Sequence, residues 1–107
     1  MSDLVQVVEA DDFAAATQFG VVLVDFFATW CRPCRMQLPI LEQIVPYFEG
    51  RAKIIKVDTD KAQDIAVRYG VQSIPTLVIL KNGAKVEQYV GLQQAETLKA
   101  ALEKAIR

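Results

Sequence analysis

Blocks of apolar residues alternate with polar turns along the chain, and the spacing within each block distinguishes strands from helices. Residues 21–28 are apolar on both faces apart from Asp25, a pattern typical of a central strand covered by helices on both sides. In residues 34–48 the apolar side chains recur at helical spacing around Pro39. This pattern predicts a single helix with a kink at the proline.

Shorter patterns predict the other elements. An acidic start and a closing Gly20 indicate a helix over residues 11–20, and Asp60 is expected to cap a short helix that runs to Tyr69. Asn82 and Gly83 supply the positive φ angles that a tight hairpin turn needs. The remaining expected elements are strands over residues 4–8, 52–59, 76–80 and 84–90 and an amphipathic helix over residues 94–106.

The order of these elements is β-α-β-α-β-α-β-β-α, which indicates an α/β fold with a mixed central sheet between layers of helices. The chain has 107 residues and no repeat or linker-like segment, so we expect one domain over residues 1–107. Because 52% of its residues are hydrophobic, a chain of this length can bury a core without disulfides or metal. The two cysteines are therefore available for chemistry.

Charge and hydropathy indicate which kinds of partner and which cellular location to expect. The formal net charge is −1, which gives no general attraction to nucleic acid or to an anionic membrane. The longest aliphatic run, residues 21–24, is far shorter than a membrane span, and the acidic N-terminal segment lacks the pattern of a secretory signal. We therefore expect a soluble, cytoplasmic, monomeric protein. All twelve basic residues lie at or after Arg32, so positive charge begins beside the cysteines.

The cysteines form the motif Cys31-Arg32-Pro33-Cys34, where the buried strand gives way to the long helix. A thiol in the first turn of a helix lies near unpaired backbone N–H groups and the positive end of the helix dipole, which favour thiolate over thiol. The cations of Arg32 and Arg35 act in the same direction, and Pro33 stiffens the turn. Residues three apart on a helix are close enough to form a disulfide after small adjustment. The motif therefore indicates a redox-active dithiol.

Three other interpretations of the pair remain open. A structural disulfide would close a loop of only four residues, for which chain entropy gives about 2 kcal/mol. A zinc site would need two more ligands, which a chain with two cysteines and no histidine could supply only as a dimer. Two inert core thiols would not require a helix start that is flanked by arginines.

Other positions also carry candidate chemistry. Asp25 interrupts an apolar strand, and burial raises the pKa of a carboxyl group, so Asp25 is a candidate proton acceptor and donor for a nearby thiol. Lys56 is a second charge within an apolar run and the expected partner of Asp25, although the two could also form a purely structural pair. Pro75 lies just before a strand, where either a cis or a trans peptide bond is possible.

Seven segments of the chain match the sequence pattern of a known family. They are V-D-F at 24–26, A-T-W-C-R-P-C-R-M at 28–36, P-I-L at 39–41, Y-G-V at 69–71, I-P-T-L at 74–77, K-N-G at 81–83 and V-G at 90–91. On these residues the chain resembles the thioredoxin family over essentially its whole length, and the match is far more specific than the cysteine pair alone. The resemblance implies a thioredoxin fold, a single domain with about five strands in a mixed sheet flanked by four helices.

The resemblance also implies an enzyme, a thiol–disulfide oxidoreductase that reduces disulfides in protein substrates. Cys31 would be the exposed nucleophile that attacks a substrate disulfide, and the more buried Cys34 would resolve the mixed disulfide. Asp25, helped by Lys56, would take the proton from Cys34 and return it in the reverse reaction.

Further implications concern the docking of substrates and the source of electrons. Ile74 would offer its backbone to an extended substrate segment, and the bond before Pro75 would be cis. The apolar docking surface would consist of Trp30, Pro33, Ile74 and Gly91, and Pro75 would also belong to the substrate-binding residues. The chain would carry no cofactor and no metal, because NADPH and FAD would be used only by a flavoprotein partner that resembles thioredoxin reductase.

Two positions depart from the family pattern. Arg32 stands where glycine is usual after the first cysteine, and a cation there stabilises the reduced form, so we expect a less reducing protein that favours acidic partners. Phe27 stands where tryptophan is common, which removes an indole N–H near the site. Three rival functions remain: a dithiol oxidant or isomerase, a binding module that does not use its cysteines, and a dimer that holds zinc or an iron–sulfur cluster.

Overall fold

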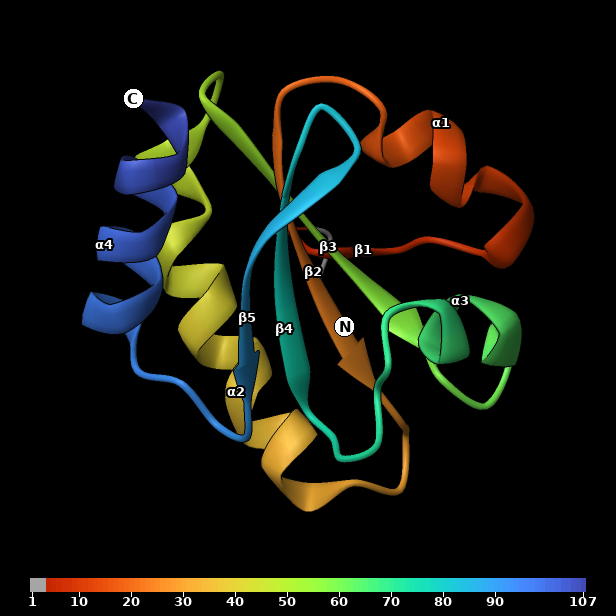
Figure 1. Cartoon of the computed structure of the whole chain (residues 1–107). Helices are drawn as coiled ribbons and strands as arrows, with labels where there is room; N and C mark the ends of the chain where they lie inside the picture. The colour runs from red at the N-terminus through yellow and green to blue at the C-terminus, as the bar shows by residue number, and fades with distance from the viewer. Residues whose placement is uncertain (1–3) are drawn as a thin grey trace.

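A computed structural model describes residues 4–107, and Figure 1 shows a twisted sheet with helices on both faces. The strands are β1 (Gln6–Val7), β2 (Val21–Phe27), β3 (Ala52–Asp58), β4 (Thr76–Lys81) and β5 (Ala84–Val90). The α-helices are α1 (Phe13–Thr17), α2 (Arg32–Ile44), α3 (Gln63–Arg68) and α4 (Ala95–Ile106), and short 3₁₀ helices occupy Ala10–Asp12 and Pro46–Phe48. The predicted order of strands and helices is confirmed.

The five strands are arranged in the order β1-β3-β2-β4-β5. β2 is parallel to β3 and antiparallel to β4, so it lies at the centre of a mixed sheet. The last two strands form the predicted antiparallel hairpin. Its turn has positive φ angles at Asn82 and Gly83, as their residue types predict.

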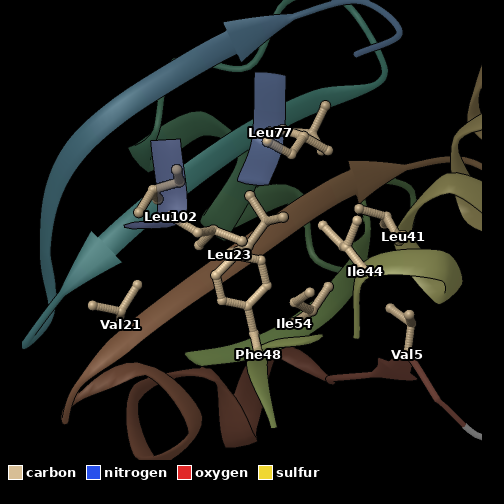
Figure 2. Packing of buried hydrophobic residues seen from close by; sticks show 11 residues of the cluster. Val5, Val21, Leu23, Leu41, Ile44, Phe48, Ile54, Leu77 and Leu102 are labelled. Carbon is tan, nitrogen blue, oxygen red and sulfur yellow. The ribbon is translucent and has the colours of Figure 1, made fainter. Parts of the chain in front are cut away.

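The central strand explains why residues 21–28 are apolar on both faces. Val21 and Leu23 pack on the side of the sheet that α2 and α4 cover, whereas Val22, Val24 and Phe26 pack on the side of α1 and α3. Figure 2 shows the first of these two cores. Helix residues complete them: Leu41, Ile44, Leu98 and Leu102 on the first side, and Phe13 and Ile65 on the second.

Several predicted boundaries differ from the structure. β1 is shorter than the predicted strand over residues 4–8, and α2 begins at Arg32, before the predicted start at residue 34. The helix continues on both sides of Pro39, and Pro46 ends it and opens a 3₁₀ turn. The predicted kink at Pro39 stays a prediction. Within the described residues no helix has the length and apolar character that a membrane crossing requires.

The prediction that Asp60 caps the third helix is wrong. α3 begins at Gln63, and its N-cap residue is Ala62, which makes no side-chain capping bond. The chain first makes a turn in which the carbonyl oxygen of Asp58 accepts bonds from the N–H groups of Lys61 and Ala62. This turn delays the helix and leaves the Asp60 carboxylate free for a contact with another part of the chain.

Candidate active site

The sheet topology brings three distant segments to one end of the molecule. β2 and β4 are antiparallel and Phe26 pairs with Thr76, so the loop after β2 lies beside the residues that precede β4. Thr76 also pairs with Val90, which places the end of β5 next to the same point. The N–H of Gly91 donates to the carbonyl oxygen of Pro75 at 2.8 Å. The two predicted docking positions Pro75 and Gly91 are therefore in direct contact.

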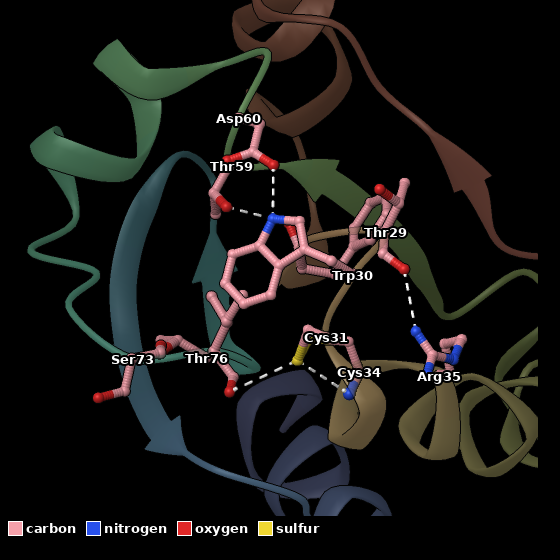
Figure 3. The surroundings of a disulfide bond; sticks show 11 residues. Thr29, Trp30, Cys31, Cys34, Arg35, Thr59, Asp60, Ser73 and Thr76 are labelled. Carbon is pink, nitrogen blue, oxygen red and sulfur yellow. Dashed lines mark hydrogen bonds between the residues drawn. A yellow bond between two sulfur atoms is a disulfide. The ribbon is translucent and has the colours of Figure 1, made fainter.

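The cysteine pair stands at the start of α2, where the motif predicts it. Cys31 is the N-cap residue, and its Sγ accepts a bond from the N–H of Cys34 at 3.2 Å (Figure 3). The two cysteines form a disulfide, and their Cα atoms are 5.3 Å apart. Cys31 Sγ also lies 3.8 Å from the carbonyl oxygen of Ile74. The sulfur that would attack a substrate is thus held between a helix N-terminus and the backbone that precedes Pro75.

Exposure does not separate the two cysteines in this oxidised state. Their side chains are 5% and 4% exposed, because Ala28, Phe27 and Ile74 pack around the disulfide. The expectation that Cys31 is exposed is therefore wrong for the disulfide form, in which Cys31 is buried almost as deeply as Cys34. The two cysteines differ in their surroundings: Cys34 lines a half-open cavity together with Asp25, whereas Cys31 faces the Ile74 carbonyl.

Asp25 is buried at the centre of β2 and faces the same side of the sheet as α2. Only 1% of the residue is exposed, and its Oδ1 atom has no hydrogen-bond partner among the described residues. Burial raises the pKa of Asp25 from 3.8 to about 7, and the charge of Lys56 opposes this only in part. A carboxyl group with this pKa exchanges protons near neutral pH. The cavity beside it has a volume of about 230 Å³ and is lined by Asp25, Phe27, Ala28, Thr29, Cys34, Arg35, Leu38 and Lys56.

Lys56 pairs with Asp25 in the register of β2 and β3, so the predicted neighbours do meet. They do not form a salt bridge in the described part of the chain: the amine of Lys56 lies over the ring of Phe27, 5.4 Å from its centroid. The geometry therefore does not support the alternative, in which Asp25 and Lys56 form a structural ion pair. Lys56 acts on Asp25 through its charge across the cavity.

The predicted docking residues lie at the same end of the sheet as the disulfide. Trp30 is 68% exposed, Pro33 is exposed, and Ile74 and Gly91 are half-buried. The peptide bond between Ile74 and the buried Pro75 is cis, as the family resemblance implies. We call Trp30, Pro33, Ile74, Pro75 and Gly91 the docking surface.

The two arginines of the motif differ in their contacts. Arg32 is exposed and belongs to the first turn of α2, next to Cys31. Arg35 is also exposed, and its guanidinium donates to the carbonyl oxygen of Thr29 at 3.1 Å. Arg35 therefore ties the loop before the cysteines to α2, while the charge of Arg32 remains on the surface.

Two contacts near the site were not predicted. The indole N–H of Trp30 donates to Asp60 Oδ2 at 2.9 Å, a bond that fixes the orientation of this exposed side chain (Figure 3). Gln37 is completely buried and binds the backbone of Gln93. The Trp30 contact spans thirty positions and leaves no local signal. A polar residue at the position of Gln37, on the buried face of α2, was a signal that the sequence did contain.

A larger hollow of about 510 Å³ lies at the other end of the sheet, near the starts of β2 and β3. It contains no cysteine and is lined by residues such as Phe19, Val21, Arg51 and Ala52. No group of three or more potential metal ligands occurs in residues 4–107. The cysteine pair and the Asp25 cavity are therefore the strongest candidate for chemistry.

A mixed sheet, a cysteine pair at the N-terminus of the following helix and a cis-proline loop beside the sulfur define a class of thiol–disulfide oxidoreductases. The chain belongs to the thioredoxin family, whose family model matches residues 4–104. It is 46% identical over 101 residues to a thioredoxin of Staphylococcus aureus, an alignment that covers 94% of this chain and 96% of the relative.

Solved structures agree with the family assignment. Thioredoxin of Malassezia sympodialis is 36% identical, with a TM-score of 0.84, and the match covers 96% of this chain and 91% of the other. A point mutant of thioredoxin from Halobacterium salinarum is 34% identical, with a TM-score of 0.88, and the match covers 100% of this chain and 96% of the other. The thioredoxin fold and the oxidoreductase class are thereby confirmed.

Proposed function

We propose that this protein reduces disulfides in protein substrates, with Cys31 as the nucleophile and Cys34 as the resolving thiol. The observation that carries the proposal is the disulfide at the N-terminus of α2, with the Ile74 carbonyl on one side and the Asp25 cavity on the other. The helix N-terminus favours a thiolate at Cys31 after reduction. The exposed Trp30 and Pro33 beside it offer apolar area to a substrate segment.

The reaction has two exchange steps. The Cys31 thiolate attacks one sulfur of the substrate disulfide, forms a mixed disulfide and releases the first substrate thiolate, which takes up a proton. Asp25 then accepts the Cys34 proton, and the Cys34 thiolate attacks Cys31 Sγ and releases the second substrate thiolate, which takes up the second proton. The substrate gains two electrons and two protons, and the chain is left with the Cys31–Cys34 disulfide. A pKa of about 7 at Asp25 lets this carboxyl group accept and return the proton near neutral pH.

The remaining parts of the proposal concern partners. The chain itself needs no cofactor or metal, and a flavoprotein similar to thioredoxin reductase regenerates the dithiol with NADPH and FAD. Arg32 makes the protein less reducing than a thioredoxin with glycine at this position, and it favours substrates whose disulfide is surrounded by acidic residues. We propose that the protein does this work in the cytoplasm as a monomer.

The first test uses Trp30, the single tryptophan of the chain, as a reporter beside the disulfide. Its fluorescence is followed in buffers of graded thiol/disulfide ratio, together with the variants Cys31→Ser and Cys34→Ser. We expect one reversible transition at a reducing potential in the wild type and none in either variant. Cys34→Ser should also trap a mixed disulfide with a protein substrate, because the resolving thiol is missing, whereas Cys31→Ser should not.

Other outcomes would favour the rival functions. A midpoint near or above that of the glutathione pool would favour a dithiol oxidant or isomerase. Absence of any transition while both thiols are free, with partner capture that survives replacement of both cysteines by serine, would favour a binding module. Visible absorbance or stoichiometric metal in the purified protein would favour the metal-bridged dimer.

A further inference from the structure

Gln37 is a buried polar residue that has no role in the two thiol–disulfide exchange steps. It lies on the inner face of α2, in a buried stripe that consists of Cys34, Gln37, Leu41 and Ile44. The side chain is 0% exposed. Burial of an amide costs free energy of folding unless each of its polar atoms has a hydrogen-bond partner. Both polar atoms of the Gln37 side chain have one.

Both ends of the Gln37 amide bind the backbone of one residue. Its Nε2 donates to the carbonyl oxygen of Gln93 at 3.0 Å, and its Oε1 accepts from the N–H of Gln93 at 2.8 Å. Gln93 belongs to residues 91–94, which connect β5 to α4 and follow the last pair of the β4–β5 ladder. Gln37 therefore gives this connection the two backbone bonds that a neighbouring strand would otherwise provide.

The connection leads directly to the docking surface. The side-chain amide of Gln93 donates to the carbonyl oxygen of Gly91 at 3.1 Å and to that of Val90 at 3.4 Å. Gly91 in turn donates its N–H to Pro75, and the preceding Ile74 carbonyl lies beside Cys31 Sγ. A continuous series of hydrogen bonds thus runs from the middle of α2 through Gln93 and Gly91 to the backbone beside the reactive sulfur.

We propose that Gln37 is a positioning residue for substrate docking. It fixes residues 91–94 against α2 and thereby sets the place of Gly91 relative to Ile74, where an extended segment of a protein substrate would lie. An apolar side chain of similar size could fill the same space in the core, but it would leave both backbone groups of Gln93 unpaired and the connection free to shift. Small disulfides do not span this surface, so their reduction does not depend on Gln37. The inference rests on the proposed function, because it assumes that the docking surface binds substrates.

The test compares Gln37→Leu with the wild type on a protein substrate and on a small one. Reduced protein is mixed with rising concentrations of insulin or of hydroxyethyl disulfide, and the reaction is quenched with acid and quantified by thiol alkylation. For Gln37→Leu we expect the half-saturating concentration of insulin to rise about 10-fold, with a maximal rate within about twofold of the wild type. The rate with hydroxyethyl disulfide and the midpoint of the Trp30 fluorescence titration should not change.

A matched control separates positioning from general loss of stability. Ile44→Val alters the same buried stripe of α2 without touching a hydrogen bond, so it should destabilise the fold and leave both substrates unaffected. Gln93→Ala removes only the side-chain bonds to Val90 and Gly91 and keeps the backbone groups of Gln93 that bind Gln37. It should raise the half-saturating concentration of insulin about threefold, and it carries the test if Gln37→Leu does not fold.

The possible results separate this inference from the proposed function. An unchanged half-saturating concentration of insulin in Gln37→Leu, or equal losses with both substrates, would overturn the role of Gln37. Trp30→Ala tests the docking surface itself and should weaken the use of insulin. If Trp30→Ala has no such effect, the proposed docking fails. If Trp30→Ala has the effect and Gln37→Leu does not, only the role of Gln37 fails.

Discussion

Asp25 shows how a single residue links the stability of this protein to its chemistry. Its carboxyl group is buried, and one of its oxygens has no hydrogen-bond partner in the described part of the chain. Lys56 lowers the pKa less than burial raises it. The ionised form is therefore destabilised by folding, and for this reason we propose Asp25 as the proton acceptor and donor near pH 7.

Replacement of Asp25 by Asn should remove a pH dependence of stability. The pKa is about 7 in the folded chain and 3.8 without burial, so the folded state holds a proton that the unfolded state has released between these pH values. The wild type should therefore lose about 4 kcal/mol of unfolding free energy between pH 4 and pH 8, whereas Asp25→Asn should not. Urea denaturation of the oxidised protein at several pH values measures this difference.

The matched control is Asp64→Asn, which removes an exposed carboxylate on α3. The unfolding free energy of Asp64→Asn should differ from that of the wild type by the same amount at every pH in this range. Parallel stability profiles for the wild type and Asp25→Asn would contradict the raised pKa.

Arg32 should influence the redox potential through its charge. A fixed cation next to Cys31 stabilises the thiolate, so its removal favours the disulfide and makes the protein more reducing. For Arg32→Gly we expect the midpoint to fall by ~10–30 mV, since Arg32 is exposed and water screens its charge. Arg32→Lys should keep the wild-type midpoint, and so should Arg107→Gly, which removes a cation at the end of α4. A midpoint that does not differ between Arg32→Gly and the wild type would refute the tuning role.

At the scale of elements, the turn of the β4–β5 hairpin also forms hydrogen bonds with a distant part of the chain. Asn82 has a φ of 51°, and its side-chain oxygen accepts a bond from the N–H of Gly20 at 2.8 Å, while its own N–H donates to the Gly20 carbonyl at 2.9 Å. The hairpin turn is therefore tied to the turn that precedes β2. The Asn-Gly sequence predicts the turn, but this tie depends on two turns that are 62 positions apart.

The two roles of Asn82 can be separated by two substitutions. Asn82→Ala loses the side-chain hydrogen bond. It also leaves alanine, which has no polar side chain to offset the strain, in the left-handed region. Together these effects should cost about 2–3 kcal/mol of unfolding free energy. Asn82→Gly loses only the bond and should cost about 1 kcal/mol, because glycine adopts a positive φ freely. Urea denaturation measures both values, and a stability equal to the wild type in either variant would disprove this account.

Helix α2 combines three tasks along a few turns. Its N-terminus holds the disulfide, its buried face packs Leu41 and Ile44 on the sheet, and Gln37 between them binds the connection that leads to the docking surface. The helix is therefore anchored on the core at the end remote from the chemistry. This anchoring fixes the position of the N-terminal turn that holds the disulfide.

At the scale of the whole molecule, the site exists only because the sheet is mixed. The antiparallel β2–β4 pair places the end of one strand beside the start of the other, and the β4–β5 pair adds Gly91 at the same edge. The parallel β2–β3 pair brings Lys56 opposite Asp25. Residues from positions 25 to 91 thus meet around one disulfide at one end of the domain.

The sequence by itself determined the order of elements, the central strand, the hairpin turn, the cysteine pair at a helix start and the burial of Asp25. Each of these follows from local spacing: apolar residues on both faces of a strand, a helical repeat, or residue types that accept a positive φ. Only the tertiary structure decided the similar burial of the two cysteines, the contact of Trp30 with Asp60 in place of a helix cap, and the pairing of Gln37 with Gln93. These features join residues that are distant in the chain, and their geometry is set by strand pairing and core packing, on which local sequence carries little information.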